Sequence, residues 1–229
     1  MNQYQIAIDG PAASGKSTVA RLVAKRLNAC YVNTGSLYRM VALACLEAGI
    51  SPKDEPEKVA RALQGWNISC VPDGAGSTQV AFNGTVVAPE RLRVAEVADN
   101  ASAVAKIPAV RDYMLDRQRD CRKLGIIIME GRDIGTVILP DATCKFFVTA
   151  SPEERARRRL AQAGEVAAGA TLATVAAEIA ARDYQDMNRP IAPLKPAEDA
   201  IQIVTDGMTP DEVADRIVGV FRNRVKEGT

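Results

Sequence analysis

Residues 10–18 read Gly-Pro-Ala-Ala-Ser-Gly-Lys-Ser-Thr, and no other segment constrains the fold as strongly. They follow the apolar run Tyr4–Asp9 and precede the helix-like run Val19–Leu27. Glycines let the backbone turn until successive N–H groups point at one anion, and the positive end of the following helix favours the same place. The pattern predicts a loop that binds a nucleoside triphosphate, in preference to a plain glycine-rich turn. Its residues are Gly10, Pro11, Ala12, Ala13, Ser14, Gly15, Lys16, Ser17 and Thr18.

Two side chains of this loop have specific predicted partners. Lys16 can reach the β- and γ-phosphate oxygens, and the Ser17 hydroxyl is placed to ligate Mg²⁺ together with the phosphates and waters. Glu130, which ends a later apolar run, is a second candidate that would ligate magnesium through water. We therefore expect Mg²⁺ to accompany ATP as the cofactor.

Short β-rich runs alternate with helical patterns along the chain. This alternation predicts an α/β fold, with a P-loop NTPase-type parallel sheet of about five strands wrapped by helices. Ligands of such sheets bind beyond the carboxyl ends of the strands. The expected strands lie near residues 4–9, 30–33, 125–130, 144–149 and 200–205.

Residues 65–90 break this alternation. They contain three short strand-like runs, and Asn83-Gly84 between two of them is a strong hairpin signal. We expect a small antiparallel β insertion on the α/β core. Residues 1–64 and 91–229 would then form that core.

Composition limits the chemistry and the partners. The chain has no histidine, which excludes mechanisms that need an imidazole base or ligand. The net charge of +1 gives no overall field for nucleic acid or an anionic membrane, and the five cysteines include no Cys-x-x-Cys pair. No signal peptide or membrane-length apolar run is present. We expect a cytoplasmic monomer that binds neither nucleic acid nor membrane.

The segment after Thr149 predicts an arginine-bearing lid at about residues 153–170. Ser151-Pro152 carries the signals of a helix start, and helical spacing places Arg155, Arg158 and Arg159 on one face. Arginine suits the clamping of a transferring phosphoryl group. The alternative is a solvated surface face.

In the next predicted helix, an apolar stripe is continued by charged residues on the same face. Leu172, Val175 and Ile179 share a face that helical spacing continues through Arg182, Asp186 and Arg189. Charges on an inward face are costly unless they are paired or face a ligand. One interpretation is mutual pairing, Arg182 with Asp186 and Asp186 with Arg189. The other, which we favour, is a site for a phosphate and a ribose.

Taken together, the motifs resemble the bacterial cytidylate kinase family within the nucleoside monophosphate kinases. The resemblance covers almost the whole chain, and the two blocks around Arg132 and Arg182 separate it from adenylate and guanylate kinases. The segments that carry it are residues 8–11, 15–18, 34–39, 101–102, 108–111, 131–136, 182–183 and 186–190.

The resemblance implies transfer of the γ-phosphoryl group of ATP to CMP and dCMP in pyrimidine nucleotide metabolism. It also implies that residues 1–64 and 91–229 form a P-loop kinase core and that the insertion of residues 65–90 lies on the CMP side. It assigns catalysis to Lys16, Arg132, Arg158 and Arg189, and further ATP contacts to Arg155 and Arg159. It assigns CMP to Thr34, Arg39, Ser102, Arg111, Arg132, Asp133, Arg182, Asp186 and Arg189. Among these, Arg39, Arg132 and Arg189 would meet the 5′-phosphate. Ser102, Arg111 and Asp133 would read cytosine, and Arg182 with Asp186 would hold the ribose. Thr34 stands where serine is expected, which keeps the hydroxyl.

Three alternatives stay open at this point. The first is another small-molecule P-loop kinase that acts on UMP or on a non-nucleotide alcohol. The second is a nucleotide-regulated switch, against which stands the lack of an Asn-Lys-x-Asp guanine-reading motif. The third is an ATP-driven mechanical subunit, which would need a long apolar strand ending in Asp-Glu.

Overall fold

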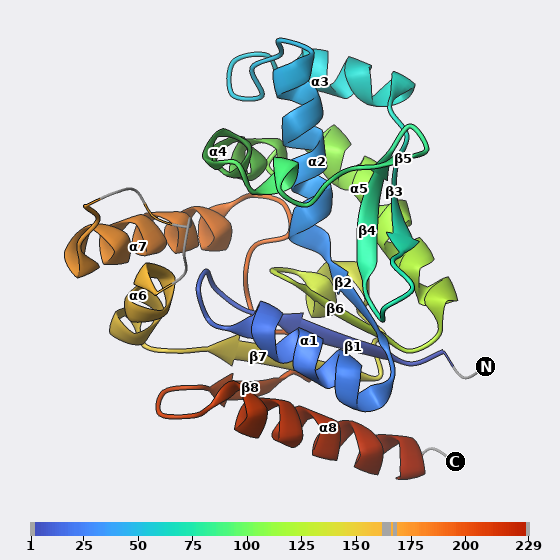
Figure 1. Cartoon of the computed structure of the whole chain (residues 1–229), viewed down its shortest axis with the longest axis vertical. Coiled ribbons are helices and arrows are strands. Elements are labelled where there is room, and N and C mark those ends of the chain that lie inside the picture. The colour runs from blue at the N-terminus through green and yellow to red at the C-terminus, as the bar shows by residue number, and fades with distance from the viewer. Residues whose placement is uncertain (1–2, 162–165, 167–168, 228–229) are drawn as a thin grey trace. The chain divides into compact units, whose positions relative to one another are not determined.

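The computed structural model describes residues 3–161, 166 and 169–227. The chain divides into two compact units (Figure 1). The first unit consists of residues 1–31 and 125–229, and the second of residues 32–124.

A five-stranded sheet forms the centre of the first unit, which confirms the predicted parallel sheet. Its strand order is β2-β6-β1-β7-β8, and β2 spans the boundary between the units. Strand β1 pairs in parallel with β6 and β7, and β7 pairs in parallel with β8. The strands are β1 (Gln5–Asp9), β2 (Cys30–Asn33), β6 (Ile127–Gly131), β7 (Cys144–Thr149) and β8 (Ile201–Val204).

The inner strands are apolar on both faces, as a covered parallel sheet requires. Ile6, Ile8, Ile128 and Phe146 are fully buried. Helices α1 (Lys16–Leu27) and α8 (Pro210–Glu227) pack against each other and share this core (Figure 1). Among the described residues, no helix is both long and apolar enough to cross a membrane.

Helices α6 (Pro152–Leu160) and α7 (Leu172–Asn188) follow the sheet strand β7 and pack on each other. The predicted start of α6 is confirmed, because the Ser151 side chain accepts a hydrogen bond from the Glu154 amide. Leu172 is wrongly predicted to belong to the buried stripe of α7, since it is 40% exposed at the first helical position. The predicted lid, residues 153–170, includes residues 162–165 and 167–168, which lie outside the described residues.

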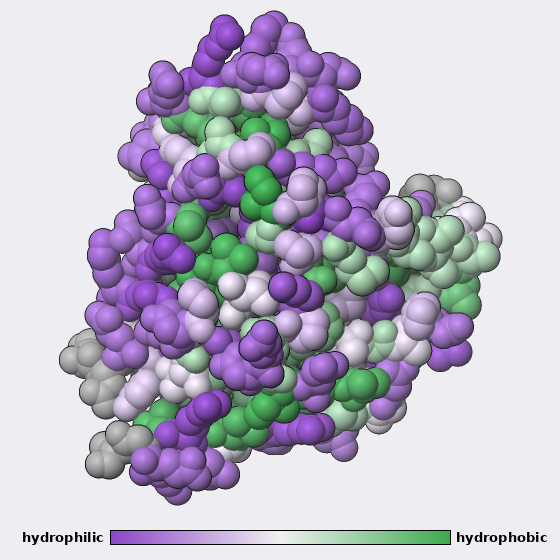
Figure 2. Space-filling model, turned by 180° about the vertical axis from the view of Figure 1, so that it is seen from behind, coloured by the Kyte–Doolittle hydropathy of each residue, from purple (hydrophilic) through white to green (hydrophobic). Residues whose placement is uncertain are grey.

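The outer side of α7 carries small apolar side chains. Alanines 173, 177, 180 and 181 are exposed. Helix α7 lies at the right edge of Figure 2, where the surface is pale green. Alanine favours the helix without requiring burial, so α7 is helical over its whole length although only a narrow stripe of it packs inward.

The second unit contains the predicted antiparallel sheet. Strand β4 pairs with both β3 and β5, and Asn83 and Gly84, both at positive φ, form the turn before β5. After this sheet the chain forms the short turn η2, then the helices α4 and α5. The elements are α2 (Thr34–Glu47), α3 (Pro56–Ala62), η1 (Leu63–Gly65), β3 (Ile68–Pro72), β4 (Thr78–Phe82), β5 (Thr85–Val86), η2 (Arg91–Arg93), α4 (Ala95–Val104), α5 (Pro108–Asp120) and η3 (Cys121–Leu124).

Helix α2 is the centre of the second unit's core. It packs against α4 and the small sheet, and Leu37, Met40 and Val41 are buried there. The proposed division into a core of residues 1–64 and 91–229 and an insertion of residues 65–90 stays a prediction.

Candidate active site

The predicted phosphate loop connects β1 to α1 in the first unit. Gly15 caps the N-terminus of α1 in the left-handed conformation, with φ of 84°. Lys16 is the first residue of the helix and only 6% exposed, and its Nζ donates a hydrogen bond to the Pro11 carbonyl at 3.0 Å. The ammonium group is thus held over the loop backbone, where an anion bound by the loop amides would meet it.

Lys16 has an unfavourable electrostatic environment. Burial, reinforced by the nearby Arg132 guanidinium, lowers the pKa of Lys16 to about 7. Glu130 acts in the opposite direction but does not cancel the effect of burial. A phosphate bound beside Lys16 would supply the negative charge that this position lacks.

Two oxygen atoms that suit magnesium lie together at the start of α1. Ser17 Oγ donates to Glu130 Oε1 at 2.9 Å, and the Tyr31 hydroxyl donates to the same oxygen at 3.2 Å. A hydroxyl and a carboxylate are the hard oxygen ligands that Mg²⁺ prefers, so the residues fit this ion.

Asp9 connects the phosphate loop to a second loop. Its carboxylate accepts hydrogen bonds from the Ile134 amide at 2.8 Å and the Gly135 amide at 2.7 Å. These amides belong to a single-turn π-helix, η4 (Ile134–Ile138). Burial raises the pKa of Asp9 to about 6, although the two amide donors act in the opposite direction. Sequence analysis missed this role; the available signal was an aspartate ending an apolar strand directly before the loop.

The loop after β6 is joined to the end of α7 by two ion pairs. Arg132 Nε contacts Asp186 Oδ2 at 2.8 Å, and Arg189 Nη2 contacts Asp133 Oδ1 at 3.0 Å. Asp133 and Arg189 are both buried. Asp186 and Arg189 therefore each have a partner on the Arg132 loop, which differs from the pairing of Asp186 with its own helix neighbours that sequence analysis considered. Two guanidiniums and two carboxylates gather in one place.

The arginines of α6 have different surroundings. Arg158 donates to the Ser14 carbonyl at 3.2 Å and to the Thr205 side chain and carbonyl at 2.8 and 2.9 Å. Arg155 is buried and pairs with Asp183, a carboxylate that sequence analysis did not consider for the site. The sequence feature that could have indicated Asp183 is its position four residues after Ile179, which places both on the inward face of the helix. Arg159 is half-buried on the same helix.

Arg182 lies half-buried on α7 in the first unit. The remaining predicted CMP contacts lie in the second unit. Thr34 is buried at the first position of α2, and Arg39 Nη1 donates to the Leu92 carbonyl at 3.1 Å. The Arg111 guanidinium is buried and lies 5.8 Å from the centre of the Tyr38 ring. Ser102 is half-buried on α4. Arg39 and Arg111 therefore each have a partner within the second unit.

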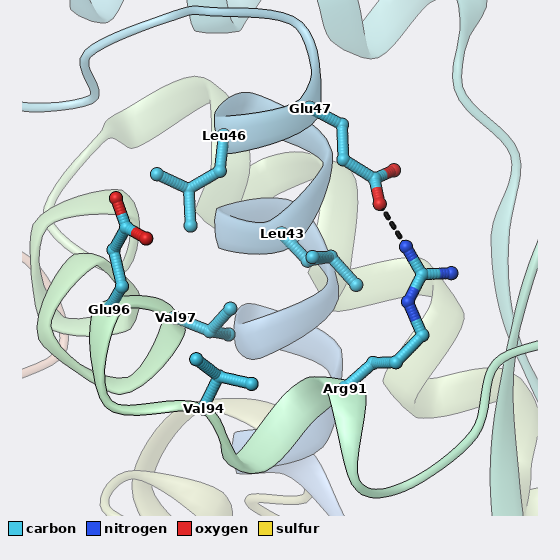
Figure 3. A pocket seen from close by; sticks show the side chains of 7 residues that line it. All are labelled: Leu43, Leu46, Glu47, Arg91, Val94, Glu96 and Val97. Carbon is cyan, nitrogen blue, oxygen red and sulfur yellow. Dashed lines mark hydrogen bonds and ion pairs between the residues drawn. The ribbon is translucent and has the colours of Figure 1, made fainter.

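The second unit also contains a pocket of about 290 Å³ (Figure 3). Leucines 43 and 46 and valines 94 and 97 line it, together with the Glu47–Arg91 ion pair and Glu96. None of the predicted site residues is among these. The pocket therefore adds nothing to the candidate site.

The parallel sheet, the phosphate loop with its lysine and hydroxyl, and the arginine-rich helix α6 define a P-loop kinase. The family model of cytidylate kinase matches residues 6–223. The chain belongs to the cytidylate kinase family and is a nucleoside monophosphate kinase.

Curated relatives match over nearly the full length. The chain is 43% identical over 227 residues to a cytidylate kinase of Leuconostoc mesenteroides, covering 98% of this chain and 99% of that protein. It is 45% identical over 224 residues to one of Limosilactobacillus reuteri, covering 97% of each chain. A solved structure of an uncharacterized protein from Eubacterium ventriosum aligns with a TM-score of 0.50 at 13% identity. That alignment covers 96% of this chain and 99% of that one. This last likeness bears on the fold alone.

Proposed function

We propose that this chain transfers the γ-phosphoryl group of ATP to CMP and dCMP, which gives ADP and CDP or dCDP. The observation that carries the proposal is the arrangement within the first unit. There a buried lysine, Lys16, lies over the phosphate loop, and the charges of Arg132 and Asp186 lie close enough to act on its pKa. Membership of the cytidylate kinase family supports CMP as the acceptor.

The reaction needs charge neutralisation more than proton transfer. An oxygen of the CMP phosphate attacks the γ-phosphorus, a new P–O bond forms, and the bond to the β-phosphate oxygen breaks with ADP as the leaving group. The attacking oxygen is already anionic, so no general base is required. Lys16, Arg132, Arg158 and Arg189 are the catalytic cations in this proposal, with Arg155 and Arg159 as the further predicted ATP-side arginines. The positive charges of the four catalytic cations would neutralise the negative charge on the transferring group.

Magnesium would be held by Ser17 directly and by Glu130 through water. When bound, Mg²⁺ would neutralise part of the negative charge on the ATP phosphates. Ser17 and Glu130 already contact each other, so both oxygens lie at the same end of the phosphate loop.

For the acceptor, we propose the contacts that the family resemblance implies. Asp133 would accept from the cytosine amine, while Arg111 and Ser102 would donate to the ring acceptors. Uracil has a carbonyl in place of the amine, so Asp133 would disfavour it. The 5′-phosphate would meet arginines 39, 132 and 189, the ribose would meet Arg182 and Asp186, and Thr34 would contribute its hydroxyl.

A substrate panel tests the function. The purified protein is incubated with ATP, Mg²⁺ and CMP, dCMP, UMP, AMP or shikimate, and ADP release is followed in a coupled assay. We expect CMP and dCMP to give the highest kcat/KM. Faster turnover of UMP or shikimate would favour the alternative of another small-molecule kinase.

Replacing Asp133 tests the cytosine contact. Asp133→Ala is expected to raise the KM for CMP at least about tenfold because a buried polar partner of the base is lost. The KM for ATP should change much less. Steady-state kinetics with each substrate varied in turn give both values.

The same variant needs a control for stability, because Arg189 loses a buried partner. Asp133→Asn keeps an acceptor oxygen for Arg189 and is expected to unfold at a temperature closer to that of the wild type. An unchanged KM for CMP in the folded Asp133→Ala protein would count against the proposed role.

A further inference from the structure

One carboxylate of α7 touches the phosphate loop directly. Asp183 Oδ1 accepts a hydrogen bond from the Ala12 amide at 3.0 Å, and Oδ2 pairs with Arg155 Nη1. Asp183 is 5% exposed and Arg155 is 8% exposed. Both oxygens of this carboxylate are therefore engaged inside the protein.

Arg155 contacts the carbonyl group of Ala12, the residue whose amide group Asp183 accepts from. Its Nη1 donates to the Ala12 carbonyl at 3.1 Å, and its Nε donates to the Ala150 carbonyl at 3.1 Å. The ion pair thus satisfies both the N–H and the C=O of Ala12 and ties them to the backbone that follows β7. Arg155 and Asp183 are 28 residues apart in the sequence and reach Ala12 from two different helices.

The loop conformation needs such support. Ala13 has φ of 56°, a left-handed conformation that is sterically unfavourable for a residue with a Cβ atom. Ala12 itself is buried in a small apolar cluster with Ala156, Val175 and Ile179. The apolar cluster holds the Ala12 side chain, and the Arg155–Asp183 ion pair holds the Ala12 backbone. Both contacts restrain the residue directly before Ala13 and so help to hold Ala13 in its unfavourable conformation.

We infer that Arg155 and Asp183 are positioning residues that hold the phosphate loop in its ATP-binding conformation through the backbone of Ala12. This inference rests on the proposed function for the identity of the nucleotide. It gives Arg155 a role other than direct contact with ATP, since Nε and Nη1 are both used within the protein. The competing interpretation is a pair that only fastens α6 and α7, which predicts reduced stability with unchanged ATP affinity.

Two substitutions of Asp183 separate these interpretations. Asp183→Ala removes the acceptor for the Ala12 amide and the ion pair, whereas Asp183→Asn removes the charge but keeps an acceptor oxygen. Both variants should lose stability. We expect the dissociation constant of ATP·Mg²⁺, measured by titration calorimetry without CMP, to rise at least about tenfold in Asp183→Ala. In Asp183→Asn it should stay within about threefold of the wild type.

Arg155→Met provides an independent route, because it keeps the apolar stem and removes the guanidinium. It too should weaken ATP binding, and adding Asp183→Ala to it should weaken binding by less than the product of the single effects, since both act through one residue. The matched control is Asp211→Asn, which breaks the surface ion pair with Arg26 and touches no part of the loop. Its ATP affinity should equal that of the wild type.

The outcomes are decisive either way. Urea unfolding of each variant shows which ones are folded, and if Asp183→Ala fails to fold, Arg155→Met carries the test. If folded Asp183→Ala or folded Arg155→Met binds ATP within twofold of the wild type, the inference is overturned. Equal loss of ATP affinity in Asp183→Asn and Asp183→Ala would also overturn the role assigned to the Ala12 amide. If the wild type binds ATP without phosphorylating CMP, the proposed acceptor fails while this inference stands.

Discussion

Lys16→Met is expected to lower kcat/KM for phosphoryl transfer by roughly 10³-fold or more, because a charge aimed at the transferring group is lost. Methionine preserves the length and the apolar stem of the side chain. The fold should survive, since the hydrogen bond lost is the single one from Nζ to the Pro11 carbonyl. The coupled ADP assay measures the loss, and circular dichroism checks the fold. Wild-type turnover in this variant would refute the assignment of the loop.

The same variant has an expected effect on stability that depends on pH. The pKa of Lys16 is lowered from an ordinary value of 10.5 to about 7, so the folded protein binds this proton less tightly than the unfolded chain. The resulting destabilisation grows as the pH falls from 10.5 and is complete below about 7. Lys16→Met removes it, so the variant should gain free energy of unfolding over the wild type at pH 7 and lose most of that gain near pH 10. Urea unfolding at the two pH values measures this difference.

Local patterns were sufficient to predict the first unit's sheet. Its strands are near-continuous apolar runs such as Ile126–Met129, and each is bounded by turn residues. The phosphate loop is also a local motif, so its place between β1 and α1 follows from contiguous residues. In the second unit, Asn83-Gly84 specified a turn because both residues tolerate positive φ.

Contacts between distant residues were beyond the reach of these patterns. Asp183 and Ala12 are 171 residues apart, and Asp9 and Gly135 are 126 apart. Helical spacing from Ile179 allows an inward residue at either 182 or 183, and the sequence alone favoured Arg182. Only the packing of α6 on α7 brings Arg155 into place to pair with a buried carboxylate at position 183.

The roles of Arg155 and Arg158 in α6 also depend on contacts that local sequence patterns do not show. Sequence analysis grouped Arg155 with Arg158 because they share a helical face, and the structure places both against the backbone of the phosphate loop. It could not distinguish an arginine that contacts ATP from one that supports the loop. That distinction depends on burial and on which acceptors each guanidinium reaches.

Gly10→Ala is expected to damage both stability and ATP binding. A Cβ atom at this position would lie 2.0 Å from the carbonyl oxygen of Val148 and 3.1 Å from its carbonyl carbon. These are backbone atoms of the neighbouring strand β7, which pairs with β1, so the clash is not relieved by rotating a side chain. Separating the strand ends should cost about 3 kcal/mol or more, and each kcal/mol should lower the melting temperature by about 2–4 °C.

A matched substitution at Gly219 provides the control. Apart from its own helix backbone and chain neighbours, no atom of the described residues lies within 4 Å of a Cβ built there, and the residue lies inside α8. Gly219→Ala should therefore raise the free energy of unfolding by about 0.5–1 kcal/mol, because alanine loses less conformational freedom in a helix. Thermal unfolding of both variants, followed by calorimetric titration with ATP, measures the two effects. Equal melting temperatures for the two variants would show that the ends of β1 and β7 can separate at Gly10 at little cost. The close approach of the Val148 carbonyl would then not explain why the loop begins with glycine.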